Sequence, residues 1–266
     1  DLTARQAVID ASLSLSGRFN SLSSGFSDLR SDLNDEIASD ASTVNQLLSD
    51  IASLNKIIST AEAGDQIGMN ANDSRDSREL KLKELSKYVD IAYTEDAQGR
   101  YLISSGGSLL VSPDGANSLV VDRAKVDLPD GTQYAQTSLR LSSTRKEFEA
   151  SGGALKALVD ARDEIVPRYQ SAIDDIASTL ATSVNEAHFQ GYDLEGRTGT
   201  YFFDPKTTGA SDIALAAGME DAPAQIAAGI GGISVGPGAA LLLSVPAAGT
   251  SLDLTATNTS ELAGSL

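Results

Sequence analysis

The only histidine in the chain is His188, so any catalytic or metal site that uses an imidazole must be built around it. The acidic residues nearest to it in sequence are Glu186, Asp193 and Glu195. A metal site needs several converging ligands, and the run that begins at Asp193 lacks the later carboxylates of a calcium-binding loop. An imidazole near a helix end can bond free carbonyls and meets the negative end of the helix dipole. We therefore expect His188 to close a helix C-terminus, and we expect no catalytic residue, metal or cofactor.

Two arginine–carboxylate neighbours, Arg78-Glu79 and Arg162-Asp163, are the other candidates for chemistry. Adjacent residues on a helix do not face one another, so neither pair forms a shared acid–base site by itself. Each charge is better interpreted as meeting a partner on another element, such as Arg78 with Asp163 or Arg162 with Asp73. The sequence has no phosphate-binding loop with Lys-Ser/Thr, and its serine-rich stretch at 21–24 lacks a Gly-x-Ser-x-Gly elbow. It therefore predicts that the protein is not an enzyme.

Composition limits the remaining classes. The 266 residues are 41% hydrophobic, which is enough to bury one or two cores. Lysine and arginine number 20 against 37 aspartate and glutamate, and the net charge of −17 disfavours binding to nucleic acid and to anionic lipid. No cysteine is present, which excludes disulfides and thiolate ligands. No run of about 18 apolar residues occurs, so no membrane-spanning helix is predicted.

Long helices must position the candidate residues. Residues 2–60 contain no proline and carry an apolar seam at helical steps, so we expect one continuous helix with Gly17 and Gly25 as its soft points. The seam comprises Leu15, Phe19, Leu22, Phe26, Leu29, Leu33, Ile37, Ala41, Val44, Leu48, Ile51, Leu54 and Ile58. Ordinary bundle packing is favoured over a homodimeric coiled coil. The partner within the chain is expected to be the helix at 152–191.

That second helix has its own apolar seam and one interruption. Its seam comprises Leu155, Leu158, Ile165, Tyr169, Ile173, Ile176, Leu180 and Val184. Pro167 lacks an amide donor and clashes one turn back, so we expect a kink near Val166 or two helices that abut there.

Between the long helices the apolar period changes. A short helix is expected at about 72–88, with Asn72 or Asp73 as its N-cap. Strand-like runs then follow at 89–94, 100–104, 108–111, 118–122 and 134–141, with turn signals between them. Further strands are expected at 212–215, 240–245 and 251–255, and a short helix capped by Asp221 at 223–228.

These elements predict an α+β fold: a long antiparallel helical stalk, a smaller β-rich domain and a β-like C-terminal segment. The expected division is 1–88 for the first stalk helices and 89–145 for the β-rich segment. Residues 146–209 would complete the stalk with the kinked helix and its turn. Residues 210–266 form a Gly/Ala-rich segment that we interpret as the start of an inserted domain.

The ordered set of motifs resembles the flagellar hook-associated protein 1 family, whose members are hook–filament junction subunits. The resemblance rests on Arg5-Gln-Ala-Val8, on the block from Leu54-Asn-Lys56 to the end of the short helix, and on residues 152–203, which end in Phe202-Phe203. The matching motif residues are Asn72, Asp73, Arg78, Arg162, Asp163, Asn185, His188 and Gly191. In the family the matching histidine belongs to a structural turn.

The resemblance implies a non-catalytic adaptor outside the cell, in the bacterial flagellum, exported without a cleavable signal peptide. It further implies a ring of identical subunits between the hook protein and a second hook-associated junction protein. The chain opens at Asp1 without a methionine or a leader, and the family's terminal helices are not found in it. The sequence therefore predicts a core fragment that is monomeric in solution.

A cell-surface adhesin whose helical stalk presents a β domain remains the alternative, because it explains the acidity and the absence of cysteine equally well. It does not explain the two motif blocks. A hydrolase of wall glycan ranks well behind, since nothing in the sequence pairs two carboxylates.

Overall fold

One uninterrupted helix, α1 (Leu2–Ala63), runs the length of the structure. At 1.5 Å per residue its 62 residues span about 93 Å. The computed structural model describes residues 1–63, 71–127 and 133–229. The helix continues through Gly17 and Gly25, where an added Cβ would meet nothing within 4 Å. The predicted single helix is confirmed, and neither glycine breaks it.

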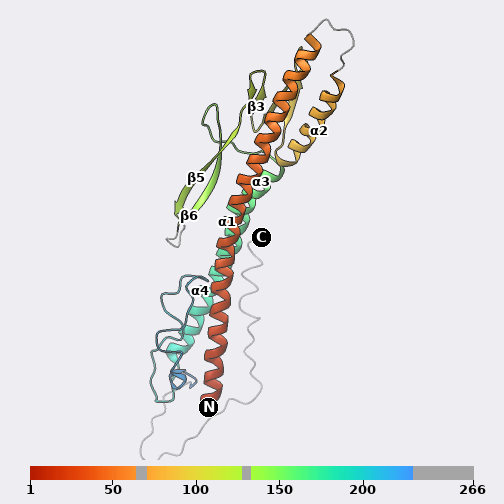
Figure 1. The fold of residues 1–266 in the computed structure, drawn as a ribbon. Coiled ribbons are helices and arrows are strands. Elements are labelled where there is room, and N and C mark those ends of the chain that lie inside the picture. The colour runs from red at the N-terminus through yellow and green to blue at the C-terminus, as the bar shows by residue number, and fades with distance from the viewer. Residues whose placement is uncertain (64–70, 128–132, 230–266) are drawn as a thin grey trace, which may run out of the picture. The chain divides into compact units, whose positions relative to one another are not determined.

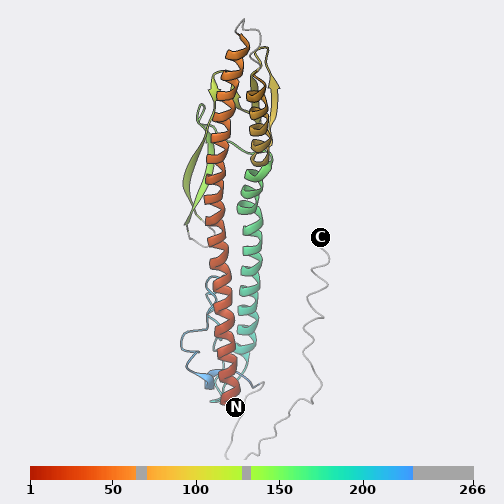
Figure 2. The ribbon, with the colours of Figure 1, turned by 45° about the vertical axis from the view of Figure 1, so that its right-hand side comes forward.

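A second line of helices runs beside α1 (Figures 1 and 2). It consists of α2 (Asn72–Tyr88), α3 (Gly153–Asp160), the π-helical turn η1 (Ala161–Ile165) and α4 (Val166–Gln190). Figure 2 shows α2 beside the C-terminal part of α1, and α3 with α4 beside the rest. The predicted packing of the 152–191 region on the first helix is confirmed.

Proline accounts for the irregularity between α3 and α4. Pro167 has no amide hydrogen and crowds the carbonyl one turn back, so regular α-helical bonding fails just before it. The amide of Val166 instead donates to the carbonyl of Ala161, five residues back. The irregularity that the sequence predicts near Val166 is present, in the form of a π-helical turn.

The buried face of α1 follows a strict seven-residue period. In its C-terminal half the period selects large apolar side chains, which are fully buried: Ile37, Val44, Ile51 and Ile58. In the N-terminal half the same period selects Ile9, which is also fully buried, and then Ser16, Ser23 and Arg30. Leu15, Leu22 and Leu29, each one position earlier, are 39–49% exposed. The prediction that these three leucines lie in the packed seam is wrong, because the neighbouring segments cover the adjacent face of α1, which carries two serines and an arginine there.

A similar correction applies to α4. Its buried residues are Val166, Ala177, Ala181, Asn185 and His188, whereas Ile165, Tyr169 and Ile176 of the predicted seam are 45–55% exposed. The π-helical turn shifts the angular phase of the side chains that follow it, which a constant helical period cannot anticipate.

The β-rich part forms two antiparallel sheets. The first has the strand order β1-β2-β3-β4, with β1 (Ala92–Glu95), β2 (Tyr101–Ser105), β3 (Ser108–Ser112) and β4 (Gly115–Ala116). The second is a hairpin of β5 (Leu119–Asp127) and β6 (Gln133–Leu141), paired in register from Leu119 opposite Leu141 to Asp127 opposite Gln133. The strands predicted over 89–141 are thus confirmed, within a few residues at their ends.

One hydrophobic core lies where these sheets meet the helices. It joins α1, α2 and α3 to the strands through Leu48, Leu85, Ile103, Leu139 and Leu155. A second core at the other end of α1 joins Ile9 and Phe19 to Ala177 of α4 and to Phe202 and Ile213. The two cores hold opposite ends of the same rod.

Several finer expectations fail. Residue 71, not Asn72 or Asp73, occupies the N-cap of α2 and makes no side-chain capping bond, so the two polar residues lie inside the first turn. Residues 212–215 form no strand; Leu215 makes one isolated bridge to Phe203. The short helix is the 3₁₀ turn η2 (Pro223–Gln225), without a cap from Asp221.

The strand predictions at 240–245 and 251–255 lie outside the described residues. The α+β fold class itself is confirmed. No helix among the described residues is long and apolar enough to cross a membrane.

Candidate functional site

Three asparagines on α1, Asn34, Asn45 and Asn55, bind the backbone of three different strands. In each case the side-chain NH2 donates to a strand carbonyl and the side-chain oxygen accepts from a strand amide. Asn45 contacts both groups of Leu119, at 2.8 and 2.7 Å. A primary amide has the donor and acceptor pair of a peptide unit, so each side chain acts as a short piece of an added strand. These backbone groups of β2, β5 and β6 are satisfied by the helix in this way.

At Asn34 an arginine from the opposite helix completes the contact. Asn34 donates to the carbonyl of Ala135 and accepts from the amide of Thr137, both at 2.8 Å. Arg162 donates through Nη1 to the same Asn34 oxygen at 2.9 Å and to the carbonyl of Thr137. All of Asn34, Thr137 and Arg162 are buried. We call this set of side chains and backbone groups the Asn34 cluster.

Asn55 repeats the arrangement about 20 residues further along α1. It donates to the carbonyl of Tyr101 at 2.8 Å and accepts from its amide at 2.9 Å. Arg78 donates to the Asn55 oxygen at 2.8 Å and to the carbonyl of Gly99 at 2.6 Å. The guanidinium of Arg78 also stacks 3.5 Å from the centre of the Tyr101 ring and is fully buried. We call this set the Asn55 cluster.

The cross-pairings expected for the two arginines are absent among the described residues. Arg78 instead lies 3.4 Å from Glu95, and Arg162 forms two bonds of 2.8 Å with the carboxylate of its neighbour Asp163. The expectation that adjacent residues do not face each other fails here because the pair lies in the π-helical turn, which spreads one turn over more residues. Asp73 lies in the first turn of α2 without a described ion pair.

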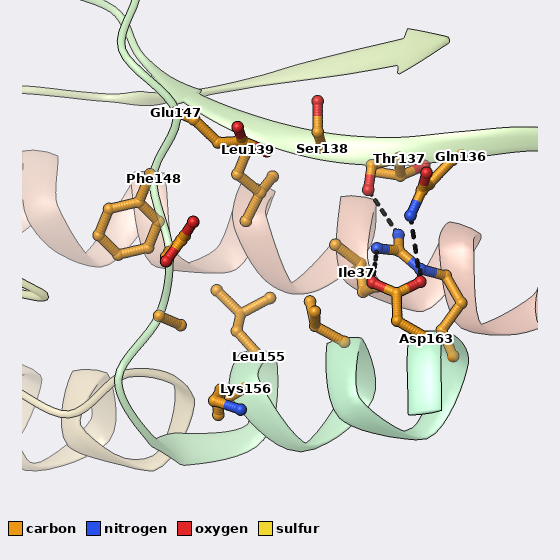
Figure 3. A pocket seen from close by; sticks show the side chains of 14 residues that line it. Ile37, Gln136, Thr137, Ser138, Leu139, Glu147, Phe148, Leu155, Lys156 and Asp163 are labelled. Atoms are coloured by element: carbon orange, nitrogen blue, oxygen red, sulfur yellow. Dashed lines mark hydrogen bonds and ion pairs between the residues drawn. The ribbon is translucent and has the colours of Figure 1, made fainter. Parts of the chain in front are cut away.

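A cavity of about 330 Å³ opens beside the Asn34 cluster (Figure 3). Leu139 of β6 and Leu155 of α3 point toward one another in it, with Ile37 of α1 nearby. Its two cations are already neutralised, Lys156 by Asp160 and Arg162 by its neighbour. The carboxylates of Glu147 and Glu149 also line the cavity, whose floor is apolar.

Near the C-terminal end of α4, Asn185 bonds the backbone of Phe202 and Phe203 in the way that the asparagines of α1 bond the strands. Its oxygen accepts from the amides of Phe202 and Phe203 at 3.0 and 2.8 Å, and its NH2 donates to the carbonyl of Phe203 at 3.0 Å. Gly191 follows the last residue of α4, and its amide donates to the carbonyl of His188 at 3.2 Å.

His188 lies in the last turn of α4, as predicted, but its ring bonds segments that follow the helix and not the last carbonyls of α4 itself. Its Nδ1 lies 2.8 Å from the carbonyl oxygen of Thr200, and its Nε2 lies 3.0 Å from the amide nitrogen of Ala227. Helix geometry directs the ring across the helix end toward these segments, where unpaired backbone groups are available. No group of three or more potential metal-ligating side chains occurs in the part of the chain that the structure describes.

Each end of the rod also carries the same turn, Asp-x-x-Gly-Arg, at 96–100 and 193–197. In both turns the aspartate accepts from the amides two and four residues later and from the arginine Nε, all at 2.8–2.9 Å. For Asp96 the amide of Arg100 is the main cause that lowers the pKa below its usual value. For Asp193 burial favours a higher pKa, but the hydrogen bonds of the turn outweigh it and the pKa is lowered.

Sequence reasoning missed the asparagines. Asn34 and Asn45 were not singled out, and Asn55 was part of a motif without a role. The spacing of Asn34 and Asn55 could have indicated that they are buried. They lie three heptads apart, on the same face of α1 as Ala41 and Leu48. The repeated Asp-x-x-Gly-Arg turn was likewise visible in the sequence.

These sites define a class of protein: a helical rod to which short β-strands are fixed through buried amide and guanidinium contacts. A family model, "Flagellar hook-associated protein FlgK helical domain", matches residues 1–203. The chain therefore belongs to the family of the FlgK helical domain.

Individual relatives agree with this assignment. The chain is 27% identical over 231 residues to flagellar hook-associated protein 1 of Bacillus subtilis, covering 76% of this chain and 44% of the relative. It is 28% identical over 205 residues to the protein of that name from Salmonella typhimurium, covering 76% and 37%. The chain thus spans less than half the length of these relatives.

A solved structure shares the fold. The flagellar hook junction protein FlgK from Burkholderia pseudomallei superimposes with a TM-score of 0.62 at 23% identity, covering 77% of this chain and 37% of that one. Rod and strands therefore recur in a protein whose sequence is largely different.

Proposed function

We propose that this chain is the helical core of a structural, non-catalytic subunit that joins the hook to the filament in the bacterial flagellum, outside the cell. Its family membership supports a flagellar role. The observation that carries the mechanical part of the proposal is the continuous α1 helix, fixed between residues 34 and 55 by the buried Asn34 and Asn55 clusters and by the partly buried Asn45 contact. An adaptor between two lattices must transmit load without changing shape, and a rod fixed at several points meets that requirement.

The partners we propose are the hook protein, a second hook-associated junction protein and further copies of the same subunit arranged in a ring. An exposed stripe on α1 offers a surface for such contacts. It consists of Val8, Leu15, Leu22 and Leu29, spaced by seven residues and 39–49% exposed. Apolar side chains in a regular row along a helix are typical of helix–helix interfaces. The 266-residue chain alone is expected to be monomeric.

The test is retention of the purified chain by immobilised hook protein, compared with an unrelated acidic protein. Wild type should be enriched, and the double variant Leu22→Asp with Leu29→Asp should lose most of the enrichment. Leu80→Asp is the matched control, because Leu80 is 69% exposed but lies on α2, away from the stripe. Equal retention of the chain and the unrelated protein would refute the adaptor role.

The observed contacts also favour structure over catalysis. Both buried arginines of the clusters are bonded to side-chain and backbone acceptors of the chain itself. The adhesin alternative gains no support from any of the relatives, which are named flagellar proteins.

A further inference from the structure

The ring of His188 lies between two backbone groups of opposite character. The Thr200 carbonyl can only accept a hydrogen bond, so Nδ1, at 2.8 Å, must carry a proton. The Ala227 amide can only donate, so Nε2, at 3.0 Å, must be unprotonated. The residue is 6% exposed, which leaves little room for water to replace either partner. The neutral ring with its proton on Nδ1 is the single state that satisfies both neighbours.

This contact closes the structure around the C-terminal end of α4. Residues 226–229 are attached there by the bond to His188 and by backbone bonds between Tyr192 and residues 228 and 229, at 3.0–3.2 Å. Ile226, at the start of the segment, is buried in the same core as Ile9 of α1. Detachment of the segment would therefore open one end of that core.

We propose that His188 is a proton-operated latch, in which the neutral imidazole holds residues 226–229 against α4 and a second proton, taken from solvent onto Nε2, releases them. The imidazolium has two N–H donors and no acceptor, so its Nε2–H would point at the N–H of Ala227. The amide loses its acceptor while still buried, and the ring carries a charge in a buried site. Both effects favour the open segment in acid.

The elements that meet at the latch carry several charged groups. They are Arg5 of α1, Glu186 of α4, Asp193, Glu195 and Arg197 of the turn, and Glu220 and Asp221 before η2. None of them forms an ion pair with His188 within the described residues, and Asp193 and Arg197 are 2.8 Å apart and paired with each other.

Because the chain has one histidine, its ring can be followed without ambiguity. Nitrogen-15 NMR of the whole chain should show a protonated Nδ1 and an unprotonated Nε2 at neutral pH. Once acid has added the second proton to the ring, as the nitrogen-15 signals will report, the exchange protection factors of the Ala227 and Ala228 amides should fall by at least about tenfold. The amide of Leu47, in the middle of α1, should keep its protection.

The control variant is His188→Gln, whose side-chain amide supplies a donor and an acceptor but does not titrate. Its protection at Ala227 should be independent of pH over the range in which the wild type opens. The proposal is overturned if the neutral ring carries its proton on Nε2, or if Ala227 keeps its protection after the wild-type ring is protonated. If the variant does not fold, these two wild-type measurements decide by themselves.

Discussion

Removal of the Asn34 side chain should be among the most destabilising single changes in the rod. Asn34→Ala leaves the amide of Thr137 and the carbonyl of Ala135 without partners, and it removes one of the acceptors of Arg162. A buried neutral group left unpaired costs about 1–3 kcal/mol, and a charged one costs more. The arginine keeps its carboxylate and carbonyl partners, so its loss is partial. The expected decrease in the free energy of unfolding is about 3–5 kcal/mol.

The assay is equilibrium denaturation followed by circular dichroism, with amide exchange at Thr137 as the local measurement. Asp32→Ala is the matched control, since Asp32 lies half a turn away on the exposed face of the same helix and should change the free energy by less than about 0.5 kcal/mol. In a double-mutant cycle, Arg162→Ala should cost less in the Asn34→Ala background than in wild type. A decrease for Asn34→Ala no larger than that of the control would refute the role assigned to the cluster.

Three further predictions follow from neighbouring features. Asn45→Ala should lower the free energy of unfolding by about 2–3 kcal/mol in the same denaturation assay. This is less than for Asn34→Ala, because no arginine bonds to Asn45. An equal decrease for the two variants would show that the lost bond to Arg162 contributes nothing to the Asn34→Ala effect. Gly153→Ala should destabilise the fold by about 2 kcal/mol or more, because φ is +79° there and the new Cβ would lie 2.5 Å from the carbonyl group of Tyr88. A higher melting temperature for this variant would contradict the prediction. Asp193→Asn should flatten the acid limb of a plot of stability against pH: the lowered pKa of Asp193 adds stability above its unfolded value of about 4, and that stability is lost as pH falls through the folded pKa. An unchanged acid limb would count against this contribution.

The elements of this fold could be predicted from sequence because their periods are strong and local. Sixty residues without proline and with apolar side chains at helical steps allow little besides a long helix, and α1 confirms it. Turn residues at 96–99 and 106–107 separated the first strands correctly, whereas the turn-like run at 113–117 contains the two-residue strand β4. Pro167 marked the irregular point, since its missing amide is a property of the residue itself.

Which face each helix buries could not be predicted from the same pattern. Leu22 and Ser23 are adjacent on α1, yet the serine is buried and the leucine is 49% exposed. An apolar helix face indicates that another element packs against it, but it does not indicate whether that element belongs to the same chain. The asparagine contacts could not be predicted for a related reason. An asparagine that bonds a strand backbone is not part of an apolar repeat, and its partners lie 46 to 103 residues away.

The period of the exposed stripe constrains what can cover it. An ideal α-helix turns by 100° per residue, so residues seven apart drift by about 20° per heptad. From Val8 to Leu29 the stripe completes three heptads, and it drifts by about 60° around α1 over a length of about 32 Å. A straight parallel helix would lose contact with one end of this row, whereas a helix inclined in the left-handed sense would follow it. The spacing of four aliphatic side chains therefore sets the handedness with which a long helix can pack along this face of the rod.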